Sequence, residues 1–218
     1  MRCVPALLFL TLTASAHDMT TAVTWSREIS RLVNRHCTGC HRDNGKAFPL
    51  TTFGEAHDRA PAIARAVLAR RMPPFGAVKG FGDLRDDTSL TQEQIELFVK
   101  WVQMGAMEGD PSLGSKDPLP QPAPEPPAPT GTAWEVKGAR TLDKPMTFKG
   151  ITAVSIPSGA SVRIVAQKPD GSVEPLIWFN AYDPKFARTW LFRKPTALPV
   201  GTKIVSSVPD GVTFSLLL

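Results

Sequence analysis

The sequence predicts two folded parts, an all-α N-terminal domain and a small C-terminal antiparallel β-sandwich, joined by a proline-rich linker. Apolar residues recur at helical spacing as far as about residue 110. Residues 111–133 carry eight prolines, a composition typical of an extended, semi-rigid spacer. Residues 134–218 contain short apolar runs broken by turn signals, which favour strands. We therefore expect a helical domain over 17–110, a linker over 111–133 and a sandwich over 134–218.

Residues 1–16 have the features of a cleaved export signal. Met1-Arg2 gives a short positive start, an almost wholly apolar run follows, and Ala14-Ser15-Ala16 matches the A-x-A cleavage pattern. The apolar run is well short of the ~20 residues that span a bilayer, so we expect cleavage and no transmembrane segment in the mature chain. We expect Cys3 to leave with the signal. The expected location is therefore the bacterial periplasm or the secreted fraction.

Three helices are expected in the first part. The first begins with Ser26 as its cap and runs into Cys37. The second begins at Thr52, because Thr52 and Glu55 have the spacing of a capping box, and it is bent or restarted at Pro61.

The third helix begins at a second capping box, formed by Thr91 and Gln94. Gly105 is the expected stop. The apolar positions of this helix recur at i, i+3, i+4 and i+7, and they are Ile95, Phe98, Val99 and Val102.

Turn signals divide the last part into strands. Asp170-Gly171 separates the apolar runs 162–165 and 176–179, which predicts a β-hairpin. Residues 198–202 form a second turn signal, and residues 212–218 form the expected terminal strand. A small antiparallel sandwich is the most economical arrangement of these strands.

The densest chemical signal is Cys37-Thr38-Gly39-Cys40-His41. This is the attachment signature of c-type haem, in which each cysteine adds to a haem vinyl group and the histidine becomes an axial ligand. A zinc site needs four ligands, but the mature chain keeps no other cysteine. A thioredoxin-like pair needs a βαβ context, which the sequence lacks. We therefore expect one haem c, attached through Cys37 and Cys40 and ligated by His41.

Met72 is the expected sixth ligand, on the haem face opposite His41. It ends the second helical stretch, which we expect to reach Arg71, and Pro73 disfavours helical backbone at the residue before it. Pro74 stiffens the loop that follows. A methionine opposite a histidine raises the reduction potential, as electron-transfer cytochromes require. The alternative role for Met72 is filling the core.

Other donors are weaker candidates. Met104 and Met107 flank the end of the last helix, where packing is the expected role. His57 lies among polar residues, and His36 is adjacent to Cys37 and cannot easily reach the opposite haem face. Three arginines precede Met72 and are candidates to pair with haem propionates: Arg65, Arg70 and Arg71.

Positive charge is concentrated in the last part. The chain holds 25 basic and 20 acidic residues, and 11 of the basic but 6 of the acidic residues lie in 134–218. This surplus suits an anionic partner or an anionic lipid surface, although a solvated surface is the commoner reason for such a surplus. Base-stacking motifs and zinc fingers are absent from the sequence, so nucleic acid is not an expected partner.

Six segments of the first part form a recognisable set: WSREI (25–29), CTGCH (37–41), FPLTTF (48–53), RMPPF (71–75), LT (90–91) and WVQMGA (101–106). Together they resemble the class I cytochrome c domain. More narrowly, they are similar to cytochrome modules of bacterial secreted proteins that are joined to a copper type II ascorbate-dependent monooxygenase-like region. The resemblance implies His41 and Met72 as axial ligands.

The last part resembles the monooxygenase-like region through its turns at 168–171 and 198–202. Copper chemistry in that family rests on histidine ligands, and residues 134–218 contain no histidine. We therefore expect no copper site in the sandwich.

The favoured function is single-electron transfer between periplasmic redox proteins, or within a larger oxidoreductase complex, with the sandwich as a docking or spacing module. Two alternatives remain open. One is a peroxidase-like enzyme with an open haem face that reduces peroxide or another small oxidant. The other is a haem-based sensor in which ligand exchange at Met72 signals through the sandwich.

Overall fold

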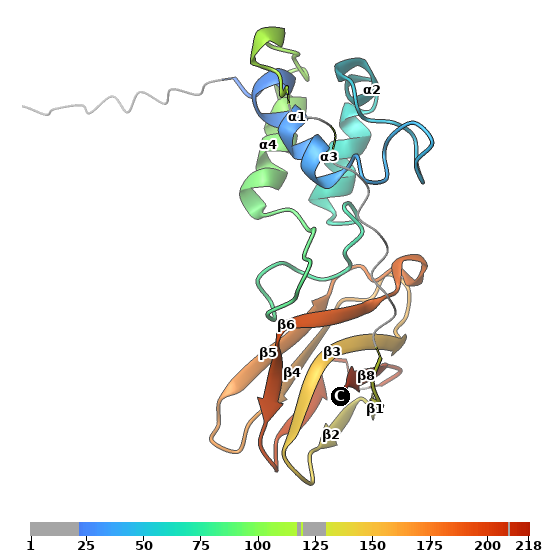
Figure 1. Ribbon diagram of the computed structural model, residues 1–218, viewed down its shortest axis with the longest axis vertical. Helices are drawn as coiled ribbons and strands as arrows, with labels where there is room; N and C mark the ends of the chain where they lie inside the picture. The colour runs from blue at the N-terminus through green and yellow to red at the C-terminus, as the bar shows by residue number, and fades with distance from the viewer. Residues whose placement is uncertain (1–21, 117–118, 120–129, 209) are drawn as a thin grey trace, which may run out of the picture.

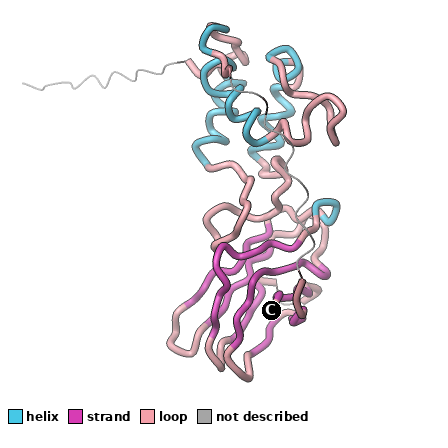
Figure 2. The backbone as a smooth tube through the Cα atoms, in the orientation of Figure 1, coloured by secondary structure: helices cyan, strands magenta, loops and turns pink. Residues whose placement is uncertain are grey.

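The computed structural model describes residues 22–116, 119, 130–208 and 210–218 (Figure 1). The α-helices gather at one end of the molecule and the strands at the other (Figures 1 and 2). The predicted export signal and residues 117–118 and 120–129 of the proline-rich linker lie outside the described residues. Within the described part, none of the helices has the length and apolar character needed to cross a membrane.

The helical part contains four α-helices packed around one apolar core. Its fully buried side chains include Ile29, Val33, Phe98 and Trp101. A five-residue π-helical turn, Trp25–Ile29, leads into the first α-helix. The α-helices are α1 (Ser30–His36), α2 (Phe53–His57), α3 (Ala60–Leu68) and α4 (Gln92–Gln103).

Both predicted capping boxes are confirmed. The Thr52 hydroxyl accepts from the Glu55 backbone N–H and the Glu55 carboxylate accepts from the Thr52 N–H, at the start of α2. Thr91 and Gln94 form the same reciprocal pair at the start of α4. Each box satisfies two backbone donors that the first helical turn leaves free.

The predicted start of the first helix is wrong, because Thr24 and not Ser26 caps it. Thr24 is extended, and its hydroxyl accepts from the Arg27 N–H at 3.4 Å. The Thr24 N–H donates to the Glu28 carboxylate at 3.0 Å, four residues along and not three. A π-helical turn closes i→i+5 hydrogen bonds where an α-helix closes i→i+4 bonds. The Thr24 hydroxyl keeps the usual partner three residues along, while the carboxylate partner lies one position further than in a capping box. Ser26 is buried inside that turn.

The second helical stretch restarts at Pro61, as predicted, but ends before Arg71. Pro61 lies in the first turn of α3, where a missing N–H costs nothing. The helix stops at Leu68 because Arg70 adopts the left-handed conformation, with φ +53°. The Arg71 N–H then donates back to the Ala66 carbonyl at 2.9 Å, which closes the helix end.

The C-terminal part is a sandwich of two four-stranded antiparallel sheets, which confirms the predicted architecture. One sheet has the order β1-β8-β3-β6 and the other β2-β7-β4-β5. The strands are β1 (Ala133–Lys137), β2 (Ala139–Thr141), β3 (Met146–Ser155), β4 (Val162–Gln167), β5 (Val173–Phe179), β6 (Thr189–Leu198), β7 (Lys203–Ser206) and β8 (Thr213–Leu217).

The predicted hairpin is confirmed as the antiparallel pair of β4 and β5. Its turn is closed by the Gly171 N–H, which donates to the Lys168 carbonyl at 3.0 Å, and Gly171 has φ +85°. The glycine is required because this backbone conformation is strained for residues with a Cβ. The predicted terminal strand corresponds to β8, which pairs with both β1 and β3.

The segment between α3 and α4 joins the two parts. Figure 1 shows it leaving α3, running down to the sandwich and returning to α4. Three of its apolar side chains, Phe75, Ala77 and Leu84, are buried in the core of the sandwich. The sequence places these residues in the helical domain, but their packing partners are strands more than 90 residues further along the chain.

Candidate haem-attachment site

The two cysteines and His41 lie on a single turn at the end of α1. Cys37 follows the last residue of the helix, and its N–H still donates to the Val33 carbonyl at 2.8 Å. The Cys37 carbonyl then accepts from the Cys40 N–H at 3.0 Å and from the His41 N–H at 2.9 Å. Both cysteines are free thiols in this structure. The turn therefore presents two thiols and one imidazole from five consecutive residues.

The two thiols differ in their surroundings. Cys40 is exposed, whereas Cys37 packs against the helical core. Burial, with a smaller contribution from the nearby Cys40, raises the pKa of the Cys37 thiol to about 12. Because a metal ligand must be a thiolate, Cys37 is a poor ligand on its own and is present as a neutral S–H group at neutral pH.

A backbone carbonyl fixes the orientation and tautomer of the His41 ring. The Nδ1 atom lies 2.9 Å from the Phe48 carbonyl oxygen, which can only accept a hydrogen bond. Nδ1 therefore carries the proton and Nε2 carries the free lone pair. The loop that brings Phe48 to His41 is closed by two backbone bonds, from the Ala47 N–H to the Cys40 carbonyl and from the Leu50 N–H to the His41 carbonyl, each 3.2 Å long.

Apolar side chains are exposed beside the segments that carry both predicted ligands. The Phe48 ring lies edge-on to the His41 ring at a centroid distance of 4.7 Å and is 48% exposed. Leu68, at the end of α3 and four residues before Met72, is 62% exposed. Exposed apolar surface next to an oriented imidazole is what a flat apolar cofactor would cover.

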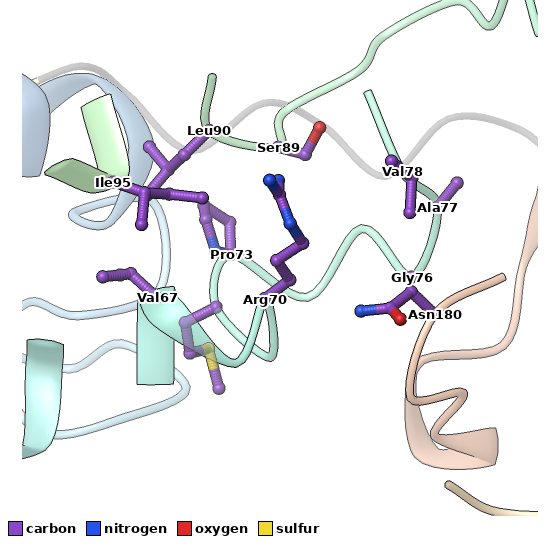
Figure 3. A pocket seen from close by; sticks show the side chains of 11 residues that line it. Val67, Arg70, Pro73, Gly76, Ala77, Val78, Ser89, Leu90, Ile95 and Asn180 are labelled. Atoms are coloured by element: carbon purple, nitrogen blue, oxygen red, sulfur yellow. The ribbon is translucent and has the colours of Figure 1, made fainter. Parts of the chain in front are cut away.

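Met72 is partly buried in the reversal that follows α3. Its N–H lies 3.4 Å from the Ala66 carbonyl, so the chain has already turned away from the helix axis at this residue. Met72 also lines a cavity of about 20 Å³ between the two parts, which has room for about one water molecule. Figure 3 shows that Val67 and Ile95 line it from the helical side and Asn180 from the sandwich side.

The three predicted propionate partners are placed differently from one another. Arg65 and Arg71 are exposed. Arg70 is partly buried, and its guanidinium donates to the Gln92 side-chain oxygen at 2.7 Å. Arg65 and Arg71 are therefore open to solvent, while Arg70 joins the end of α3 to the start of α4 and lines the same cavity as Met72.

The competing donors are engaged or distant. The ring nitrogens of His36 lie 3.2 Å from the Thr88 carbonyl and 3.3 Å from the Gln94 amide nitrogen. His57 is exposed, and its Nδ1 atom lies 3.7 Å from a carboxylate oxygen of the adjacent Asp58. Met104 and Met107 are exposed and follow the C-terminal end of α4. The 12 residues of α4 span about 18 Å, and the opposite end of the helix, at Gln92, is the end that contacts Arg70.

Comparison with known proteins gave no match among protein-family models, curated proteins or solved structures. Within the described ranges, three or more His, Cys, Asp or Glu side chains never gather as a metal-binding cluster.

The geometry of the turn fits a covalently attached haem. Two thiols precede an imidazole whose Nε2 is free, and uncovered apolar surface lies beside it. The Phe48 carbonyl, which orients the His41 ring, was not predicted from the sequence. Its local signal is Pro49, which favours extended backbone at Phe48 and leaves the carbonyl free to reach His41.

Proposed function

We propose that this chain is a periplasmic monohaem c-type cytochrome that carries single electrons between redox partners. The observation that carries the proposal is the hydrogen bond from His41 Nδ1 to the Phe48 carbonyl, on the same turn as Cys37 and Cys40. A bond of this kind holds the ring in one orientation and leaves Nε2 as the free donor atom. The helical part would then be a cytochrome c-like domain, in line with the resemblance of its motifs to class I cytochromes.

Four side chains have distinct roles in this proposal. Cys37 and Cys40 would hold a haem covalently, each thiol adding across one vinyl group to give a thioether with no atom lost. His41 Nε2 and the Met72 sulfur would be the two protein donors to its iron. The bound haem supplies the one-electron couple between Fe(II) and Fe(III). With both axial positions occupied by protein donors, electron transfer needs no bound substrate.

The partners follow from compartment and charge. Bacterial c-type haem is attached after export, so the signal-like residues 1–16 and the CxxCH motif indicate the same compartment. Periplasmic redox proteins, alone or in a larger oxidoreductase complex, are the partners we propose. The sandwich carries the basic surplus and would steer an anionic partner at low ionic strength.

Covalent attachment is tested on the mature chain produced by export in a bacterium that has the haem-attachment machinery. We expect the haem to remain with the polypeptide in acidic acetone, and the denatured mass to exceed the chain mass by one intact haem. Replacing both Cys37 and Cys40 by alanine should abolish the added mass, whereas Cys3→Ser should not. Extraction of haem from the wild-type chain by acidic acetone would contradict the proposal.

A further inference from the structure

The segment that follows Met72 closes the open side of the sandwich. β5 and β6 are edge strands of the two sheets, and residues 75–85 hydrogen-bond to both of them. Edge strands carry unpaired backbone groups that proteins normally cover. Here the covering segment comes from the domain that carries the predicted haem ligands.

The first anchor is Phe75, three residues after Met72. The Trp190 indole Nε1–H of β6 donates to the Phe75 carbonyl at 2.8 Å, and both side chains are buried in the sandwich core. The residues between Met72 and Phe75 are Pro73 and Pro74, whose rings fix φ. Met72 is therefore tied to a buried hydrogen bond through backbone with few free torsions.

The second anchor lies on β5. Ala77 forms an isolated antiparallel β-bridge with Phe179, and the Val78 N–H donates to the Trp178 carbonyl at 2.9 Å. Gly82 then crosses the sheet edge with φ +84°, and a Cβ at this position would lie 2.1 Å from the Leu176 carbonyl oxygen. Only glycine allows so close an approach.

The third anchor lies on β6. Leu84 forms an isolated antiparallel β-bridge with Phe192, and the Arg193 N–H donates to the Asp83 carbonyl at 2.7 Å. The Asp83 carboxylate and the Arg193 guanidinium form an ion pair at 3.1 Å. The segment is thus held at three places before it returns to Leu90, which is buried in the helical core.

We propose that the sandwich is the clamp that positions Met72 as the sixth ligand, with Trp190 as the chief positioning residue. The proposal rests on the proposed haem site. The segment between α3 and α4 is irregular, and an irregular loop that holds a weak thioether donor needs external support. The sandwich supplies that support through the anchors on β5 and β6. It therefore sets the ligation state of the haem as well as serving as a spacer.

The test uses the full haem-loaded chain and free imidazole as a probe that competes for the sixth position. Trp190→Phe removes the donor to the Phe75 carbonyl and keeps an aromatic ring. We expect it to weaken the Met–S→Fe charge-transfer band and to tighten imidazole binding by about tenfold, since a buried hydrogen bond is lost and an acceptor is left unpaired. Trp134→Phe, at a partly buried tryptophan on β1 whose ring packs against Phe148 and Arg140, is the matched control and should change neither readout.

Met72→Ala separates a failed clamp from a failed haem ligation. In the Met72→Ala background, Trp190→Phe should leave imidazole affinity unchanged, because there is no thioether left to position. If Met72→Ala alone changes neither the spectrum nor imidazole affinity, the proposed axial ligation is wrong. If Met72→Ala acts but Trp190→Phe does not differ from Trp134→Phe, the clamp is overturned and the ligation stands.

Asp83→Asn provides a second variant in case Trp190→Phe fails to fold. The Asp83 side chain is exposed, so its replacement should leave the core intact. We expect imidazole to bind about twofold more tightly, with the difference shrinking at high salt. Unchanged affinity at low salt would overturn the contribution of the ion pair to the clamp.

Discussion

The Arg70 guanidinium donates to the Gln92 side-chain oxygen at 2.7 Å, which ties a residue two positions beyond the end of α3 to the first residue of α4. Between these two residues the chain leaves the helical part, covers the edge strands of the sandwich and returns. The contact thus joins the two ends of the segment that leaves the helical part at Met72 and returns to it before α4.

Arg70 has two opposing effects that substitutions can separate. Its side chain makes the bond to Gln92, but its φ of +53° is unfavourable for any residue with a Cβ. Arg70→Ala loses the bond and keeps the strain, so we expect a loss of about 1 kcal/mol in unfolding free energy. Arg70→Gly should recover about 1 kcal/mol relative to Arg70→Ala. Urea denaturation measures both, and an Arg70→Gly variant less stable than Arg70→Ala would contradict this account.

The predicted sixth ligand is tested by three alanine variants. Met72→Ala should convert a six-coordinate low-spin haem into a high-spin or misligated one, because it removes the axial thioether. Met104→Ala and Met107→Ala should leave the spectrum unchanged, since both residues lie at the far end of α4. An unchanged low-spin spectrum in Met72→Ala would assign the sixth position to another donor.

The sandwich core depends on a residue outside residues 134–218. Leu84 is 5% exposed and packs among sandwich side chains. Leu84→Ala should lower the unfolding free energy by about 2–4 kcal/mol, as core truncations of this kind do. Val154→Ala, at a 54% exposed position on β3, should cost less than about 0.5 kcal/mol. Urea unfolding monitored by tryptophan fluorescence measures both losses. Equal losses of unfolding free energy in the two variants would show that the segment does not complete the core.

His36 makes stability depend on pH. Its pKa is lowered, chiefly by burial, with Arg35 and Lys79 acting in the same direction and the Thr88 carbonyl and Asp87 opposing it. The unfolded state therefore binds a proton at higher pH than the folded state does. The contribution of neutral His36 to stability is full above about pH 6.5 and is lost as pH falls below that value.

The variant His36→Gln should flatten the dependence of unfolding free energy on pH below about 6.5. His57→Gln is the control, because His57 is exposed and the ionic neighbour it has is the adjacent, exposed Asp58. Thermal unfolding measured at closely spaced pH values gives the slope of unfolding free energy against pH for each variant. A slope for His36→Gln equal to that of the wild type would assign the dependence to another group.

Local signals in the sequence predicted much of the fold. The Thr91 and Gln94 box, the Gly171 turn and the apolar run 162–165 are read within a few residues, and each is confirmed as a cap, a turn or a strand. The cap at Thr24 was missed because the π-helical turn moves the partner carboxylate one position along the chain.

The docking of residues 75–85 was not predictable from local pattern. Glycines at 76, 80 and 82 interrupt its apolar pattern, and its partners, such as Phe192 for Leu84, lie far along the chain. Backbone hydrogen bonds to an edge strand leave no residue-type signal, because every residue except proline carries the same groups. Gly82 was the one local clue, since a glycine in an irregular segment often marks a close backbone approach.

The absorption spectrum of the oxidised, haem-loaded wild-type chain tests the central claim most directly. His41 and Met72 ligation predicts a six-coordinate low-spin spectrum with a Met–S→Fe charge-transfer band near its red edge. A peroxidase-like haem with an open face would give a high-spin spectrum, and a second histidine ligand would give a low-spin spectrum without the band. Either of those two spectra, in the chain with its sandwich intact, would contradict a His/Met-ligated electron carrier.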